Sequence, residues 1–160
     1  MGANPGAMVY VPRRRGAGLT APRSLGLTEV FMSRKRILVV EDNEDNRRIL
    51  LYRLRKIGDF DIVETANGAE AVAAVELQPP DLIFMDLKMP VMDGWEATRR
   101  IRALDAGRTI PIIALTAQAM AGDEQKALAN GCNDYLAKPV VDPSLVREKI
   151  ERLLGVTAKH

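Results

Sequence analysis

The sequence has very little cysteine, few aromatic residues and no long apolar run. Its one cysteine in 160 residues, Cys132, excludes an internal disulfide and a zinc site built from cysteines, and it suits a reducing compartment such as the cytoplasm. Aromatic residues make up 4% of the chain, which argues against a surface that stacks single-stranded nucleic acid. No uninterrupted apolar run approaches the ~20 residues of a membrane-spanning helix. These absences favour a cytoplasmic globular protein without direct contact to membrane or nucleic acid.

Basic charge is concentrated in residues 1–33. This segment holds four arginines against one glutamate, a net charge of +3, whereas residues 34–160 hold 19 basic and 20 acidic side chains, a net charge of −1. A charge of +3 is too small to support DNA binding by charge alone. Glycine, proline and alanine are frequent and no helical or strand period persists, which predicts a disordered leader over 1–33. A transit peptide is one alternative. We favour another, in which translation begins at Met32.

From Arg36 onward, short apolar runs alternate with longer helical patterns. The runs that predict strands are 36–40, 61–65, 81–85, 111–115 and 133–137, and the stretches that predict helices are 43–57, 67–77, 94–104, 118–130 and 142–154. The strand segments show little polar alternation, which is typical of parallel strands covered on both faces. Five such units predict an α/β doubly wound parallel sheet in one domain over residues 34–156, followed by a short tail over 157–160.

Polar side chains follow four of the five predicted strands. In chain order they are Glu41 with Asp42, Asp86, Thr116 and Lys138. Because the carboxyl ends of parallel strands meet at one edge of an open sheet, where such folds bind their ligands, we expect these residues to share a site. The strand 61–65 ends only in Thr65 and is expected to lie off the site.

Each of these residues alone has a simpler interpretation. The acidic pair could cap a helix, Asp86 could belong to a turn, Thr116 could cap a helix and Lys138 could be a solvated lysine. The coincidence at four strand ends favours one shared site over four separate explanations. Asp93-Gly94, by contrast, is expected to be only a turn or the start of a helix.

The chemistry of such a site follows from its charges. Three clustered carboxylates repel one another, and each pair costs roughly 4 kcal/mol at 4 Å with an effective dielectric constant near 20. Because the available ligands are oxygens, the relieving cation is expected to be Mg²⁺, or alternatively Mn²⁺. One carboxylate could then attack phosphorus to give an acyl phosphate, with Lys138 and Thr116 contacting the phosphoryl oxygens.

Four segments resemble the receiver domains of two-component response regulators. They are ILVVEDN, LIFMDLKMPVMDG, IIALTA and GCNDYLAKP, within a resemblance that spans 121 residues from Arg34 to Leu154. The resemblance implies a flavodoxin-like (βα)5 fold with strand order 2-1-3-4-5. The stretches EDNEDN and GCNDYLAKP look most like the receivers of hybrid kinases and of stand-alone regulators of the DivK type.

The resemblance implies a role for each residue at the strand ends. Asp86 matches the phosphorylated aspartate, Asp42 a direct Mg²⁺ ligand and Glu41 the residue that holds a metal-bound water. The backbone carbonyl of Lys88 matches a further metal ligand. Lys138 matches the lysine that contacts the phosphoryl group.

Further positions match the family's conformational switch. Thr116 matches the hydroxyl that turns toward the phosphoryl group, and Tyr135 matches an aromatic residue that follows it, although Tyr135 could also be simply a half-buried strand residue. Ala117 matches a small residue that leaves a path for the donor. Lys88 and Gln118 occupy positions that tune the phosphoryl lifetime, and the bond before Pro139 is cis in relatives.

Two surfaces are candidates for partner binding. The helix 43–57 has more apolar residues than one buried stripe needs, which predicts a patch near Asn46, Leu50 and Arg53, although a generously apolar core helix is the alternative. The resemblance implies that this helix docks a histidine kinase or a histidine phosphotransfer domain. It also implies an output face from Gln118 through Tyr135 to the last helix, for a target protein or a weak phosphorylation-dependent dimer of an otherwise monomeric protein.

We therefore predict a single-domain response regulator of a phosphorelay that acts through protein contacts. It is not a metabolic enzyme and catalyses only its own phosphorylation and dephosphorylation. The main alternative is a pseudo-receiver scaffold that works without phosphorylation. A haloacid-dehalogenase phosphatase is disfavoured because it needs a second acid where this chain has Lys88, and a flavodoxin because the carboxylates would repel the flavin phosphate.

Overall fold

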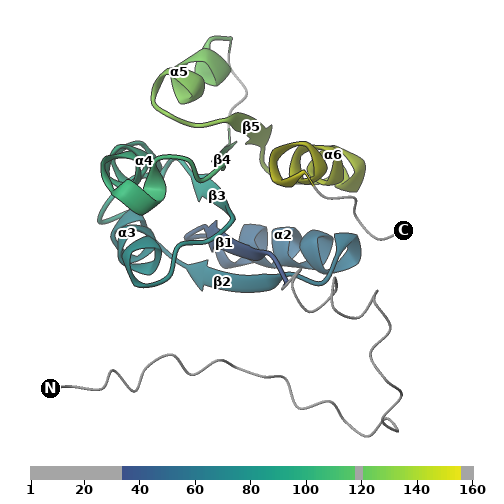
Figure 1. Ribbon diagram of the computed structural model, residues 1–160. Coiled ribbons are helices and arrows are strands. Elements are labelled where there is room, and N and C mark those ends of the chain that lie inside the picture. The colour runs from purple at the N-terminus through teal and green to yellow at the C-terminus, as the bar shows by residue number, and fades with distance from the viewer. Residues whose placement is uncertain (1–33, 118–120, 156–160) are drawn as a thin grey trace, which may run out of the picture. The chain divides into compact units, whose positions relative to one another are not determined.

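Five parallel strands form the centre of the structure, a computed structural model that describes residues 34–117 and 121–155 (Figure 1). The strands are β1 (Arg36–Val40), β2 (Asp61–Thr65), β3 (Leu82–Asp86), β4 (Ile112–Thr116) and β5 (Asp134–Ala137). The helices are α2 (Glu44–Ile57), α3 (Gly68–Leu77), α4 (Gly94–Ala103), the short 3₁₀ turn η1 (Asp105–Gly107), α5 (Asp123–Ala129) and α6 (Pro143–Leu154). The predicted leader, the tail and Gln118 lie outside the described residues.

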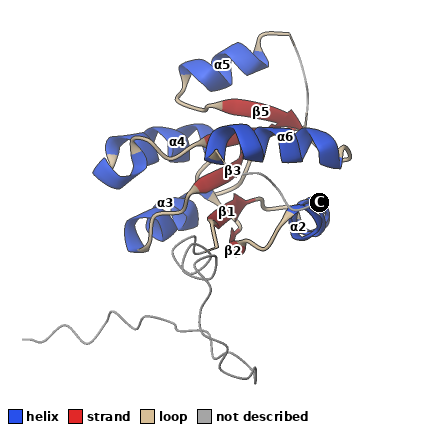
Figure 2. Ribbon diagram, turned by 45° about the vertical axis from the view of Figure 1, so that its right-hand side comes forward, coloured by secondary structure: helices blue, strands red, loops and turns tan. Residues whose placement is uncertain are grey.

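The strand order is β2-β1-β3-β4-β5, and every neighbouring pair is parallel. Figure 2 shows β2 at the bottom, β1 and β3 above it and β5 at the top. The chain winds from β1 out to β2 and then back past β1 to β3, so its direction reverses between β1 and β3. Doubly wound folds bind their ligands at the carboxyl ends of the strands beside such a reversal. The flavodoxin-like fold and its predicted strand order are confirmed.

Alternate residues of the strands pack against different helices because successive side chains of a strand point to opposite faces. Ile37 and Val39 of β1 pack in a cluster with residues of α2 and α6, whereas Leu38 and Val40 pack in a second cluster with residues of α3, α4 and α5. Figure 1 shows α2 and α6 on one side of the sheet and α3 and α4 on the other. The central strands are buried on both faces, as their sequences predict.

Most helices begin at a polar side chain that accepts a hydrogen bond from the first turn. These residues are Asn43, Asn67, Asp93 and Asp142. The fourth predicted helix, 118–130, was wrong as one continuous helix. Residues 121–122 form a turn and α5 begins at Asp123, because Gly122 has a φ of 94° that an α-helix cannot contain.

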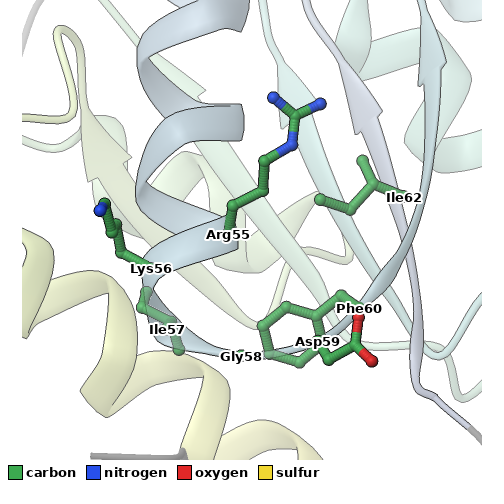
Figure 3. A pocket seen from close by; sticks show the side chains of 7 residues that line it. All are labelled: Arg55, Lys56, Ile57, Gly58, Asp59, Phe60 and Ile62. Carbon is green, nitrogen blue, oxygen red and sulfur yellow. The ribbon is translucent and has the colours of Figure 1, made fainter.

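A shallow cavity of about 620 Å³ lies between the end of α2 and the start of β2. Figure 3 shows Arg55 and Lys56 on α2 together with Phe60 and Ile62 around it. This cavity is at the amino ends of the strands and contains none of the residues predicted for the site. Among the described helices, none combines the length and the apolar character that crossing a bilayer requires.

Candidate functional site

Three carboxylates converge at the carboxyl ends of β1 and β3. Glu41 and Asp42 follow β1, and Asp86 is the last residue of β3 because its backbone still pairs with Leu115 of β4. One carboxylate oxygen from each of the three lies within 4.8 Å of the others. Glu41 and Asp86 are each 1% exposed, whereas Asp42 is exposed to solvent. The structure thus brings together the acidic residues that the sequence places at two strand ends.

Lys138 adds a positive charge to this cluster. Its Nζ lies 3.1 Å from Oδ1 of Asp86 and 3.2 Å from Oε2 of Glu41. The end of β5 positions the lysine, since its backbone N–H donates a 2.7 Å hydrogen bond to the carbonyl of Thr116. The peptide bond between Lys138 and Pro139 is cis. Counted as fully ionised, three carboxylates and one ammonium would give the cluster a formal net charge of −2.

Burial and neighbouring negative charge change the protonation of Asp86. Burial and the charge of Glu41 raise the pKa of Asp86 from 3.8 to about 7, and the nearby carboxyl group of Asp42 adds to this, while Lys138 opposes it. Burial lowers the pKa of Lys138, but its hydrogen bond to Asp86 and the neighbouring carboxylates raise that pKa overall. Lys138 therefore stays charged, but its positive charge does not fully offset the cost of ionising the buried Asp86.

The cluster fits a hard divalent cation. Its side-chain ligands are all carboxylate oxygens, which Mg²⁺ and Mn²⁺ prefer. Among the described residues, Oδ2 of Asp86 is buried and has no hydrogen-bond partner. An unpartnered buried carboxylate oxygen is costly, and a cation bound at the cluster would relieve the repulsion among its carboxylates.

The loop after β3 holds Asp86 through its backbone. The N–H of Lys88 donates to Oδ1 of Asp86 at 3.2 Å, and the N–H of Gly94 donates to the carbonyl of Leu87 at 3.1 Å. A Cβ on Gly94 would lie 2.0 Å from the carbonyl oxygen of Asp86, so only glycine fits there. Asp93-Gly94 starts α4, as the sequence suggests, with Asp93 as its cap. The contact of Gly94 with Asp86 was missed, since one glycine after a cap does not reveal what it packs against.

The same loop contains a strained turn. Val91 has a φ of 70°, and the N–H of Met92 donates to the carbonyl of Pro90 at 2.8 Å, which defines a γ-turn centred on Val91. This conformation is unfavourable for a β-branched residue. Val91 is also 86% exposed, so the strain lies at the surface between the two anchored ends of the loop.

The remaining predicted residues differ in their exposure to solvent. Thr116 ends β4 and is buried, and Tyr135 is half-buried on β5, in register with Ala114. Burial and the nearby acids of α5 raise the pKa of Tyr135. Ala117 and the side chain of Lys88 are exposed. Gln118 lies outside the described residues.

The exposed apolar patch of α2 differs from the predicted one. Leu50 is 1% exposed and belongs to the core, so its place in the patch was wrong. Ile49 and Tyr52 are instead 36% and 55% exposed. The cationic groups of Arg53 and Lys56 lie 5.8 and 5.4 Å from the centre of the Tyr52 ring. Composition shows that α2 has surplus apolar residues, but only packing against the sheet decides which of them face solvent.

A comparison with protein families identifies the family of this chain. The model of the response regulator receiver domain matches residues 37–151, which is most of the chain. The chain belongs to this family. It is therefore the receiver domain of a two-component response regulator, and the convergent carboxylates lie in the part of the chain that the match covers.

Two relatives illustrate the range of proteins that carry a similar receiver. The polar-differentiation response regulator DivK of Brucella anthropi is 38% identical over 121 residues, which cover 76% of this chain and 97% of that protein. Two-component system protein A of Emericella nidulans is 47% identical over 116 residues, which cover 71% of this chain and 17% of that protein. The receiver thus resembles nearly the whole of one relative and a small part of the other.

Two solved structures resemble this receiver closely. The receiver domain of the sensor histidine kinase PA1611 from Pseudomonas aeruginosa, with a magnesium ion coordinated in its active site cleft, has a TM-score of 0.71 and 43% identity, covering 78% of this chain and all of that one. The receiver domain of Ssk1 from Saccharomyces cerevisiae, in complex with the histidine phosphotransfer protein Ypd1, has a TM-score of 0.66 and 38% identity, covering 74% of this chain and 88% of that one.

Proposed function

We propose that this receiver accepts a phosphoryl group on Asp86 from a phosphohistidine donor. One observation carries the proposal. Oδ1 of Asp86 is engaged by the ammonium of Lys138 and the N–H of Lys88, while Oδ2 is buried without a partner among the described residues. A carboxylate anchored through one oxygen and free at the other is suited to act as a nucleophile.

Mg²⁺ is the proposed cofactor, with Mn²⁺ as an alternative. Asp42 and Asp86 would hold it directly with the backbone carbonyl of Lys88, and Glu41 would hold one of its waters. When bound, the ion supplies positive charge that neutralises the phosphoryl oxygens. The magnesium ion in the Pseudomonas receiver and the clustered carboxylates of this chain support the choice.

The proposed reaction transfers the phosphoryl group from nitrogen to oxygen. Oδ2 of Asp86 attacks phosphorus, a P–O bond forms as the P–N bond of phosphohistidine breaks, and the electron pair returns to the donor imidazole. Lys138, 3.1 Å from Oδ1, places a positive charge beside the new phosphoryl group. Hydrolysis later regenerates the carboxylate and releases phosphate. The chain thus acts only on its own phosphorylation state and is not a metabolic enzyme.

The phosphoryl group would change the conformation through β4 and β5. We propose that Thr116 turns toward it and that Tyr135 follows, since Thr116 ends β4 and Tyr135 lies on the adjacent strand β5, in register with Ala114 two residues earlier. The altered surface would include α5, β5 and α6, where a target protein or a second copy of the chain would bind. Phosphorylation would shift the balance between two existing conformations. Lys88 and Gln118 would set how long the phosphoryl group lasts.

The donor would dock on α2. Its first turn lies directly after the acidic pair, and Ile49 and Tyr52 on it are exposed. The complex of the Ssk1 receiver with a phosphotransfer protein supports a histidine phosphotransfer domain, or the equivalent part of a histidine kinase, as the donor. The cytoplasm is the proposed location, because Cys132 is a free buried thiol, which suits a reducing compartment.

Phosphotransfer from a protein donor tests this function. A histidine phosphotransfer domain, phosphorylated beforehand with phosphoramidate, would be mixed with the wild type and with Asp86→Asn, each with Mg²⁺ or EDTA. We expect transfer to the wild type only, and only with Mg²⁺. A correctly folded wild type that takes up no phosphoryl group from several such donors would favour the pseudo-receiver scaffold instead.

A further inference from the structure

Arg47 connects β2 to the acidic turn after β1. Its Nη1 donates a 2.9 Å hydrogen bond to the backbone carbonyl oxygen of Glu41, and its Nε donates a 3.2 Å hydrogen bond to Oε1 of Glu64. Its side chain is 23% exposed, although it starts from the first turns of α2. One guanidinium therefore links the acidic pair, α2 and the penultimate residue of β2.

A backbone hydrogen bond also holds this turn to β2. The backbone N–H of Glu41 donates a 3.1 Å hydrogen bond to the carbonyl of Thr65 at the end of β2. Both backbone polar groups of Glu41 are thus held by β2, its N–H directly and its carbonyl through Arg47 and Glu64. The strand that contributes no side chain to the carboxylate cluster still holds the backbone of that cluster.

The orientation of Asp42 depends on this backbone. The carbonyl of Glu41 belongs to the same planar peptide unit as the N–H of Asp42, so fixing one orients the other. Packing does little for Asp42, because it is exposed, unlike Glu41 and Asp86. The hydrogen bond to the Glu41 carbonyl therefore restrains the backbone at Asp42 and, with it, the direction in which the Asp42 side chain leaves the backbone.

We propose that Arg47 is a positioning residue for the metal site and that Glu64 orients Arg47 for this task. The inference rests on the proposed Mg²⁺ dependence. Mg²⁺ demands near-ideal octahedral geometry, so a small rotation of a ligand weakens binding. Groups that orient metal ligands typically change metal affinity about 10–100-fold when they are removed.

The Mg²⁺ affinity should depend on the geometry of the Arg47 guanidinium and not on its charge alone. Two of its nitrogens, in a fixed planar fork, reach two acceptors on different segments. A lysine ammonium is a point charge on a flexible stem and cannot reproduce that fork. Glu64 also offsets the positive charge. The Arg47→Lys variant consequently separates the two contributions.

Mg²⁺ titration by isothermal calorimetry tests the proposal on the full chain. We expect Arg47→Ala and Arg47→Lys each to raise the Kd for Mg²⁺ about tenfold, and Glu64→Gln to raise it by a smaller factor. Arg48→Ala is the matched control, because Arg48 is adjacent and 72% exposed and pairs only with Glu44 among the contacts recorded for it. Its Kd should stay within about twofold of the wild type. Thermal unfolding in EDTA, measured in parallel, reports on folding separately from metal affinity.

Three results would overturn the inference, and they differ from failure of the proposed function. If folded Arg47→Ala binds Mg²⁺ as tightly as the wild type, Arg47 does not position the site. If Arg47→Lys alone retains wild-type affinity, charge and not geometry is what matters. If Arg47→Ala fails to fold, unchanged affinity in both Arg47→Lys and Glu64→Gln would still refute the proposal. A wild type that binds no Mg²⁺ would contradict the proposed function itself.

Discussion

Replacing Asp86 by asparagine should stabilise the metal-free protein, and more so at high pH. The pKa of Asp86 is raised from 3.8 to about 7, mainly by burial and by the charge of Glu41. Each pKa unit corresponds to roughly 1.4 kcal/mol, so ionised Asp86 costs the folded state about 4 kcal/mol relative to the unfolded chain. Asparagine has a similar shape but does not ionise, so it avoids this cost.

The pH dependence follows from the direction of this shift. Between about pH 4 and pH 7 the unfolded chain has released the Asp86 proton while the folded protein still binds it, so folding is progressively disfavoured as pH rises. The penalty is absent below both pKa values and complete above about 7. From pH 5 to pH 8 the wild type should lose roughly 2–3 kcal/mol of unfolding free energy relative to Asp86→Asn.

Urea denaturation followed by circular dichroism, in EDTA, measures this difference. Asp105→Asn is the control, since Asp105 is 94% exposed and forms only a surface pair with Arg108 among the contacts recorded for it. The control should follow the wild type within about 0.5 kcal/mol at both pH values. A gap between wild type and Asp86→Asn that stays constant with pH, or a wild type that is the more stable at pH 8, would refute the reasoning.

Three further variants probe the acceptor loop and the docking helix. Lys88→Ala should change the rate of autodephosphorylation more than the rate of phosphorylation, and an unchanged decay of the phosphorylated variant would contradict this role. Gly94→Ala places a Cβ 2.0 Å from the carbonyl of Asp86 and should cost about 2 kcal/mol or more of unfolding free energy, whereas a wild-type urea midpoint would disprove that contact. Tyr52→Ala should slow transfer from a phosphotransfer domain about tenfold but leave the rate with acetyl phosphate unchanged. Equal slowing with both donors would argue against docking there.

The convergence of the charged residues followed from the sequence because one topological rule governs it. Parallel strands that end in polar residues bring them to one edge, and the rule holds without knowledge of any side-chain contact. Strands β3 and β4 end one residue later than predicted, so Asp86 and Thr116 are the last residues of these strands and still lie at the carboxyl edge of the sheet.

The parts that escaped prediction depend on contacts between distant segments. In the sequence, Gly94 is a typical turn residue, and its close approach to the carbonyl of Asp86 is apparent only in the structure. In the sequence, Arg47 is one of several arginines of a predicted helix, and its hydrogen bonds to Glu41 and Glu64 are apparent only in the structure. The burial of Leu50 depends on the rotation of α2 against the sheet, which surplus apolar residues leave undetermined.

Intact-mass spectrometry after incubation with acetyl phosphate tests the central claim most directly, because it needs no knowledge of the natural donor. The wild type, Asp86→Ala and a wild-type sample in EDTA would be compared. We predict that only the wild type with Mg²⁺ gains the mass of one phosphoryl group. An equal gain in Asp86→Ala or in EDTA, or no gain in any sample, would contradict Mg²⁺-dependent phosphorylation of Asp86.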